Sequence, residues 1–264
     1  MRYTQECWDT AQAFRADAHR RAEPHTKPRA SIRIFVSPWV ERVLGRAHPI
    51  TPALWFGPFI GLAAYRAFTV PTVRPAAALL FAAGWLFWTL LEYVLHRFLF
   101  HMAAHTPEER LRAFLMHGYH HEFPSDGMRL VAPPLMSWPL GLAVGVLMYL
   151  IVGPVFWIFS FAGAAAGYIA YDWIHYYTHH AHPRTALGRR LKRYHLAHHF
   201  SDDGSHFGVS SPLWDVIFRT YRARPRARLR ASSPIPPQRD LNDNNFVRGE
   251  SLRSTGISRP RRRS

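Results

Sequence analysis

Four long apolar segments constrain this chain more than any other feature of its sequence. They cover residues 53–70, 76–95, 139–152 and 154–174, and residues 131–138 can lengthen the third. A helix needs about 20 predominantly apolar residues to cross a bilayer, and these segments have almost no polar face. We therefore predict an all-α integral membrane protein with four transmembrane helices. The alternative is a soluble protein in which four such helices are buried.

The connections between the segments predict two hairpins. Residues 71–75 separate the first pair, and only Gly153 and Pro154 separate the second pair. Arg74 is the only charged residue in either turn, so every long charged stretch falls on the opposite side of the membrane. The positive-inside rule makes that side cytoplasmic. We expect a multi-pass protein with both termini in the cytoplasm and no N-terminal signal peptide.

The ends of the chain are polar and basic. The formal net charge is +16, and residues 222–264 contribute +9 of it, from 12 arginines and 3 acidic residues. Alternating Arg and Pro there predict a disordered tail that attracts anionic lipid headgroups, and without interleaved aromatic residues we expect no nucleic-acid partner. Residues 1–30 are expected to be irregular. We divide the chain into a basic cytoplasmic N-terminal segment (1–50), a membrane domain (51–221) and an Arg/Pro-rich tail (222–264).

Histidine is the unusual residue in this composition. There are 17 histidines, 14 of them from His96 to His206, against a single cysteine, Cys7. This excludes a disulfide framework and any Cys-ligated zinc or iron–sulfur site, and it favours a metal site built on imidazole. The histidines form four clusters that begin just past the cytoplasmic ends of the apolar segments: His96 and His101; His117, His120 and His121; His175, His179 and His180; His195, His198 and His199.

Helical geometry gives these spacings a meaning, because positions i, i+3 and i+4 share one face. His117, His120 and His121 are therefore expected to point the same way, and so are the three histidines of the last cluster. His96 and His101 differ by a rotation of about 140° on an α-helix. We expect the helix to bend or end near His96, or the two side chains to reach the site from different sides. His180 is five residues after His175 and is a poorer candidate than His179. The other ten imidazoles indicate two metal ions with about five ligands each.

Two carboxylates are candidates for orienting these histidines. Glu92 lies one turn before His96, and Asp172 lies three residues before His175. A metal-bound histidine usually donates its other N–H to a carboxylate or a carbonyl, so we expect this role for both. The spanning segments themselves lack histidine, which favours a cap at the membrane surface over a transport pathway. Two alternatives to an enzyme remain. One is a membrane protein that binds or transports metal, and the other is a structural membrane protein with a degenerate metal site.

Taken in order, the motifs resemble the fatty acid hydroxylase superfamily, the membrane di-metal oxygenases related to sterol desaturases, and most closely its fatty acid 2-hydroxylases. The matching stretches span roughly residues 90–220. They are Glu92 and Tyr93 followed by HRFLFH (96–101), MHGYHHEFPSDGMRLVAPP (116–134), YDWIHYYTH (171–179), YHLAHHF (194–200) and FGVSSPLWDVIF (207–218). The second and last of these distinguish the 2-hydroxylase branch from sterol or carotenoid relatives.

The resemblance implies a cytoplasmic helical cap carrying a di-metal centre, with no catalytic residue beyond the ligands. The ten implied ligands are His96, His101, His117, His120, His121, His175, His179, His195, His198 and His199. His105, His180, His182 and His206 fall outside these positions. Iron is expected for O2 chemistry, and zinc is possible in the isolated protein.

The implied reaction is that of a monooxygenase of lipid biosynthesis, which hydroxylates an acyl chain at C2 with O2 as co-substrate. The alternative within the superfamily is a sterol or carotenoid hydroxylase or desaturase. The spanning helices would hold the acyl chain. Arg97 and Arg129 either bind its headgroup or are solvated or paired arginines. Several relatives carry a fused haem domain with an HPGG motif, which this sequence lacks. Electrons are therefore expected from a separate donor, a b-type cytochrome or a ferredoxin with its reductase.

Overall fold

The computed structural model describes residues 2–14, 31–200 and 204–222, which belong to one folded unit, Met1–Arg222. The predicted disordered tail lies outside these residues, apart from Arg222, and so does most of the N-terminal stretch predicted to be irregular.

Helices make up all the regular structure of the described residues, apart from one isolated antiparallel bridge between Tyr3 and Phe35. The predicted all-α class is therefore confirmed for this part of the chain. In chain order the elements are α1 (Gln5–Ala13), α2 (Pro38–Leu44), α3 (Thr51–Thr69), the 3₁₀ turn η1 (Pro71–Val73), α4 (Arg74–Val94), the π-helix η2 (Leu95–Phe100), α5 (Pro107–Ala113), the π-helix η3 (Phe114–Gly118), α6 (Tyr119–Glu122), α7 (Pro134–His180), α8 (Ala186–Phe200) and α9 (Leu213–Ile217).

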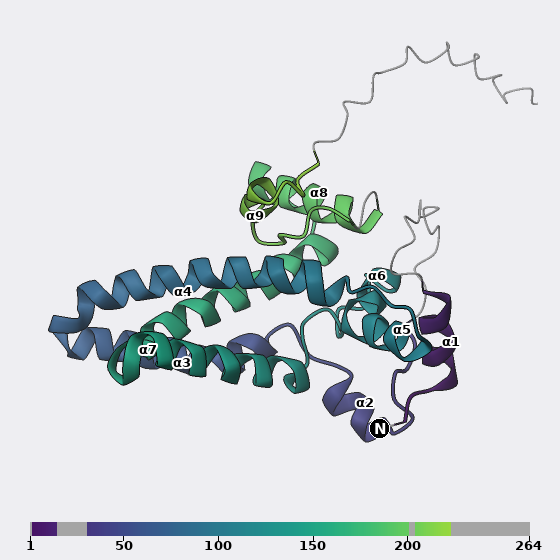
Figure 1. Cartoon of the computed structure of the whole chain (residues 1–264), viewed down its shortest axis with the longest axis horizontal. Coiled ribbons are helices and arrows are strands. Elements are labelled where there is room, and N and C mark those ends of the chain that lie inside the picture. Colours follow the sequence, from purple (N-terminus) through teal and green to yellow (C-terminus); the bar gives the residue numbers. More distant parts are fainter. Residues whose placement is uncertain (1, 15–30, 201–203, 223–264) are drawn as a thin grey trace, which may run out of the picture. The chain divides into compact units, whose positions relative to one another are not determined.

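Two helical stretches of the described chain are long and apolar enough to cross a membrane, Pro71–Phe100 and Pro134–His180. The second is interrupted at Gly153, whose φ of 78° and ψ of 174° are not helical. There the chain turns back on itself, so α7 consists of a first limb (134–152) and a second limb (154–180) that run in opposite directions (Figure 1). A positive φ is accessible to glycine without steric cost, which is why the turn falls at this residue.

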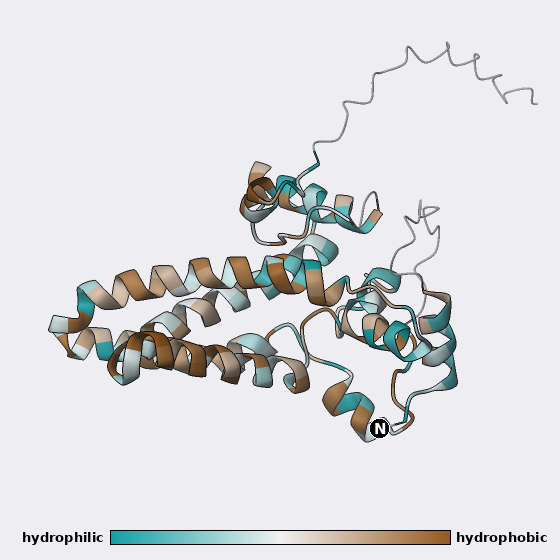
Figure 2. Cartoon of the chain, in the orientation of Figure 1, coloured by the Kyte–Doolittle hydropathy of each residue, from teal (hydrophilic) through white to brown (hydrophobic). Residues whose placement is uncertain are grey.

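The long helices pack closely because glycines remove side chains from their contacts. A Cβ atom on Gly84 of α4 would lie 1.9 Å from the carbonyl oxygen of Ser160, and one on Gly163 would lie 2.0 Å from that of Phe81. Both distances are far below van der Waals contact, so α4 and the second limb of α7 meet backbone to backbone. The apolar surface of α3, α4 and α7 contrasts with the more polar short helices (Figure 2).

The N-terminal segment is more ordered than its composition suggests. Thr4 caps α1 by accepting a hydrogen bond from the backbone N–H of Cys7, at 3.1 Å. Cys7 and Ala11 then pack into a buried apolar cluster with Phe114 and Tyr119. The expectation of irregular structure is therefore wrong for Gln5–Ala13. Two buried side chains on one face decide the outcome, since tertiary packing outweighs weak helix propensity.

The short helices form a layer at one end of the long ones, which we call the cap: α5, η3, α6, α8 and α9 with the loops between them. The π-helix η2 continues α4 toward the cap, and α8 follows α7 after residues 181–185. The histidine clusters lie at the two ends of the segment 96–101, on η3 and α6, at the end of α7 and on α8. These elements form the junctions between the long helices and the cap (Figure 1).

Candidate metal centre

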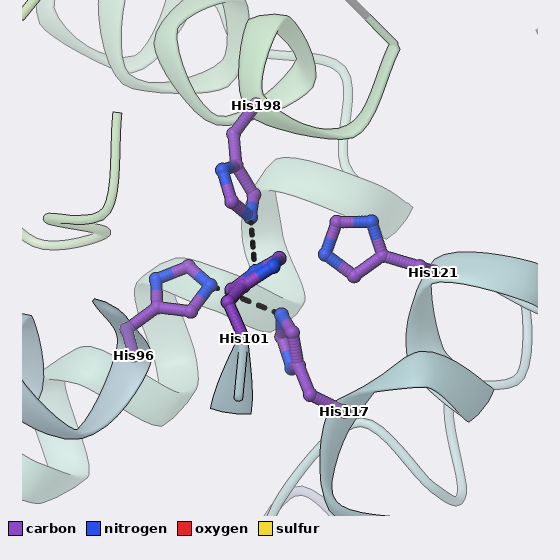
Figure 3. A group of neighbouring side chains, drawn as sticks. All are labelled: His96, His101, His117, His121 and His198. Atoms are coloured by element: carbon purple, nitrogen blue, oxygen red, sulfur yellow. Dashed lines mark hydrogen bonds between the residues drawn. The ribbon is translucent and has the colours of Figure 1, made fainter. Parts of the chain in front are cut away.

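The structure gathers the ten predicted ligands into two groups of five. Within each group, the candidate ligand nitrogens all lie within 4.8 Å of one another. Figure 3 shows the first group, whose rings converge from several elements on a common point. The first group is His96, His101, His117, His121 and His198, and the second is His120, His175, His179, His195 and His199.

His96 and His101 reach the same group because the helix between them changes its winding. α4 ends at Val94, and residues 95–100 continue as a π-helix, in which the backbone N–H of His101 donates to the carbonyl oxygen of His96 at 3.3 Å. This hydrogen bond joins residues five apart, so a spacing that diverges on an α-helix shares one face here. The expectation that the α-helix ends near His96 is confirmed.

Each histidine triplet is divided between the two groups, which corrects the expectation that its members point the same way. His117 and His121 belong to the first group, while His120 belongs to the second. The later triplet has the reverse arrangement, since His195 and His199 belong to the second group and His198 to the first. In each triplet, the two histidines four residues apart belong to one group. The histidine between them points about 100° away from the one that follows it, and it belongs to the other group.

The ring nitrogens that meet within each group are Nε2 atoms. In the first group, His96 lies 3.0 Å from His117, and His101 lies 3.0 Å from His198. In the second group, the corresponding distances are 2.9 Å for His175 and His120, 3.0 Å for His120 and His199, and 2.8 Å for His179 and His195.

These spacings fit a metal ion with ligands at near right angles. Nitrogens bound about 2.1 Å from one ion lie about 3.4 Å apart at tetrahedral angles and about 3.0 Å apart at right angles. The 2.8–3.0 Å separations match the second case. Five ligands per group also exceed the four of a tetrahedral structural zinc site. The donor set therefore fits a pair of ions with more than four ligand positions each.

The protonation of the first group also suits a cation. Nδ1 of His96 pairs with the carbonyl oxygen of Phe207, and Nδ1 of His198 with that of Ser205 at 2.8 Å. A carbonyl only accepts, so each Nδ1 carries the proton and each Nε2 of the neutral ring presents a lone pair to the group. Nε2 of His121 is buried and has no hydrogen-bond partner among the described residues, which leaves a donor atom for an ion to use.

Burial keeps the cap histidines uncharged. Desolvation lowers the pKa of His117, His120 and His195 well below the usual value, and neighbouring histidines lower it further. The same holds for the pKa of His198 and His199. A neutral imidazole is the form that binds metal, so the fold holds these side chains ready for an ion.

The loop 205–210 orients the first group, and two buried carboxylates hold this loop in place. Glu92 accepts hydrogen bonds from the backbone N–H groups of Val209 and Ser210, both at 2.7 Å, and from the Ser210 hydroxyl. Asp215 accepts from the backbone N–H groups of Phe207 and Gly208 at 2.9 and 2.7 Å. The two carboxylates thus hold residues 207–210, and the carbonyl group of Phe207 that meets His96 belongs to this stretch.

The two predicted orienting carboxylates act differently from the expectation. Glu92 supports His96 through the loop rather than by direct contact. The expected pair of Asp172 and His175 is not formed, since Oδ2 of Asp172 and Nδ1 of His175 both lack a hydrogen-bond partner within the described residues. Asp172 is buried and lines the cavity described below. The role of Asp215 was missed, because a motif that marks a branch of the family gives no sign that this carboxylate holds the backbone N–H groups seven and eight residues earlier.

The remaining histidines and the two candidate arginines lie outside the groups. His180 stacks on Tyr176, and His206 pairs with the Ser205 hydroxyl. Arg97 donates to the Tyr93 hydroxyl at 2.9 Å. Arg129 is buried between Glu41 and Asp126, with 2.6 Å to the latter. These partners engage the Arg129 guanidinium, and the residue also contributes to the wall of the cavity described below.

An apolar cavity of about 350 Å³ adjoins both groups, and we call it the metal-side cavity. His117 of the first group and His120 and His175 of the second form part of its wall. Its other end runs between the long helices, where Leu140, Val144, Ala164 and their neighbours line it. The charged residues Glu92, Arg129 and Asp172 also contribute to its wall, and most of the remaining lining is apolar. A mainly apolar space that reaches both histidine groups fits a hydrocarbon chain whose one end is presented to them.

The chain is similar to proteins of known activity. A profile of the family named fatty acid hydroxylase matches residues 81–220. A dihydroceramide fatty acyl 2-hydroxylase of Arabidopsis thaliana is 42% identical over 55% of this chain, and a second one from that plant is 36% identical over 64%. The human fatty acid 2-hydroxylase is 35% identical over 75% of this chain.

These matches cover different shares of the relatives: 62% of the first plant protein, 71% of the second and 58% of the human one. Among solved structures, the hydroxylase domain of full-length scs7p superposes with a TM-score of 0.61 at 32% identity, covering 70% of each chain. The chain therefore resembles the hydroxylase domain of scs7p in sequence as well as in fold.

Proposed function

Because this chain belongs to the fatty acid hydroxylase family, we propose that it is a membrane-bound di-metal oxygenase that hydroxylates an acyl chain at C2, with O2 as co-substrate and electrons from a separate donor. The strongest support for this proposal is the lining of the metal-side cavity. The metal-side cavity is lined mainly by apolar side chains, and its wall includes histidines of both groups. An apolar substrate and two adjacent ions are what such a reaction requires.

The ten histidines of the two groups hold the ions, five to each. Bound iron would supply the redox chemistry that activates O2 toward an unreactive C–H bond, which zinc, having no redox chemistry, does not provide. The neutral rings bind without first losing a proton, and the loop 205–210 keeps two of them oriented. The apolar part of the cavity wall excludes water around the acyl chain and aligns C2 with the histidine end.

We further propose that the chain crosses the membrane four times, as two hairpins with the cap and both termini in the cytoplasm. α3 and α4 form the first hairpin through η1, and the two limbs of α7 form the second through Gly153. Large apolar side chains on their outer faces support this arrangement: Leu79 of α4 is 71% exposed, and Leu150 in the first limb of α7 is 73% exposed. Such faces are stable against lipid and costly in water.

A lipid profile tests this function. The chain is expressed in a bacterium that lacks 2-hydroxy acyl chains, together with a b-type cytochrome or a ferredoxin and its reductase. The total lipid is hydrolysed and 2-hydroxy fatty acids are measured by gas chromatography–mass spectrometry. We expect a 2-hydroxy product from the unaltered chain, none from His120→Ala, and an unchanged amount from His182→Ala, an exposed histidine outside both groups.

Other outcomes of this experiment favour other functions. Hydroxylated or desaturated sterol or carotenoid, formed when these are supplied in place of acyl substrates, would favour that branch of the superfamily. Metal uptake by cells without any product that depends on O2 and reductant would favour a metal-binding or transport protein.

A further inference from the structure

A second apolar cavity, of about 310 Å³, lies between α3 and the first limb of α7, and we call it the distal cavity. Its wall includes Phe59, Gly145, Tyr149 and Trp157, none of which lines the metal-side cavity. Among the residues that the structure describes, neither histidines nor charged residues line it. Methylene and methyl groups are therefore the chemistry that fits it.

The two cavities share one stretch of wall. Phe56, Gly141 and Phe161 line both of them. Phe56 is 7% exposed, and its ring packs edge-on against Tyr168 with 5.4 Å between the centroids. A Cβ atom on Gly141 would lie 2.6 Å from Cε1 of Phe56. The absence of a side chain at position 141 therefore leaves room for the Phe56 ring.

We propose that the distal cavity binds the tail of a long acyl chain, and that Phe56 divides it from the metal-side cavity and so sets which chain lengths are hydroxylated. This inference rests on the proposed function and adds a binding site and a specificity residue to it. A chain whose C2 lies at the histidine end extends away from the cap, and its tail meets Phe56 at the shared wall. A short chain ends before this residue, whereas a longer one has to displace the ring and enters the distal cavity.

Two substitutions test the division in opposite directions. Phe56→Ala removes the ring and joins the cavities. Gly145→Leu fills the distal cavity alone, because a Cβ atom there meets only ordinary contacts, the nearest at 3.6 Å from Phe161. Phe68→Ala and Gly61→Leu are the matched controls on α3, since Phe68 is 79% exposed and a Cβ on Gly61 has no atom within 4 Å.

Cells expressing each variant receive equal amounts of fatty acids of about 16 carbons, the length that fills one leaflet, and of about 24 carbons. The readout is the ratio of long to short 2-hydroxy product. We expect Phe56→Ala to raise it about tenfold and Gly145→Leu to lower it about tenfold, the discrimination that small changes in an apolar pocket achieve. Both controls keep the ratio of the unaltered chain. An unchanged ratio in both Phe56→Ala and Gly145→Leu overturns the proposal.

A binding measurement separates this inference from the proposed reaction. Purified protein in detergent is irradiated with acyl probes of the two lengths that carry a diazirine on the last carbon, and labelled peptides are identified by mass spectrometry. We expect the long probe to label the segment around Gly145 and Trp157 and the short probe to label the metal-side cavity. Equal labelling of Gly61, on an open face, indicates lipid contact only and overturns the distal site. If the unaltered chain makes no 2-hydroxy product, the proposed function fails while this labelling still decides the distal site.

Discussion

The backbone N–H of His101 donates to the carbonyl oxygen of His96, five residues earlier in the chain. This one π-type hydrogen bond brings both rings to the same side of the helix, where they join the first histidine group. Their spacing on an α-helix would have turned them apart by about 140°. A local change of winding, in the turn where the long helix meets the cap, therefore completes a set of five ligands.

Removing one ligand from each group should affect one ion at a time. We expect the metal content of purified protein, measured by mass spectrometry of the dissolved metal, to fall by about one ion per chain in His101→Ala and also in His179→Ala, because each ring belongs to a different group. The double variant loses about two. Exposed His105→Ala is the control and keeps the full content. A loss of both ions from either single variant would contradict two separable sites.

The carboxylate of Glu92 should be needed as an acceptor more than as a charge. Glu92→Ala leaves two backbone N–H groups and the Ser210 hydroxyl unpaired, and we expect it to cost about 3 kcal/mol or more in stability. Glu92→Gln keeps one acceptor oxygen for the two N–H groups and should cost less. Thermal unfolding in detergent measures both. Equal midpoints for the two variants would show that the hydrogen bonds to the loop are not what stabilises it.

Arg129 should anchor the N-terminal segment to the cap. It is buried between Glu41 and Asp126, and Arg129→Met leaves both carboxylates without this partner. Breaking a buried ion pair costs about 3–5 kcal/mol. Arg46 is the matched control, because it is 43% exposed and lies 3.9 Å from the same Glu41. Arg46→Met should cost less than about 1 kcal/mol. Similar unfolding midpoints for the two variants would argue against the buried anchor.

The stability of the metal-free protein should decrease as the pH falls. Burial lowers the pKa of His117, His120, His195 and His198 in the folded state well below the ordinary value of 6.5. The unfolded chain therefore takes up protons below about pH 6.5 that the folded chain does not, so stability is full above this pH and is lost below it. Unfolding midpoints of chelator-treated protein at a series of pH values measure the effect. A midpoint that rose on acidification would reverse the sign.

Close packing at Gly84 should tolerate no side chain. A Cβ atom there would lie 1.9 Å from the carbonyl oxygen of Ser160, so Gly84→Ala must push α4 away from the second limb of α7. We expect a loss of about 2 kcal/mol. Gly61→Ala adds a methyl group where no atom lies within 4 Å, and it should stabilise the helix by about 0.5–1 kcal/mol. The difference between the two unfolding midpoints in detergent is the measurement.

Some features of this protein are readable in its sequence because they depend on residues close together in the chain. The helical class follows from long apolar runs, and the ten histidines that the structure gathers follow from motifs of a few residues each. Other features depend on distant partners. α1 forms because Cys7 and Ala11 pack against residues beyond position 110, and Glu92 holds a loop more than 100 residues away. No local pattern identifies those partners.

The sequence alone determines which histidines are available and how neighbouring ones diverge. His120 and His121 point about 100° apart on an α-helix, and so do His198 and His199. Only the tertiary structure decides where each one goes. Packing of the two π-helices and α8 around the ends of α4 and α7 brings His121 to His198 in one group and His120 to His199 in the other. Backbone geometry sets the directions of these side chains, and the contacts between distant helices decide what they meet.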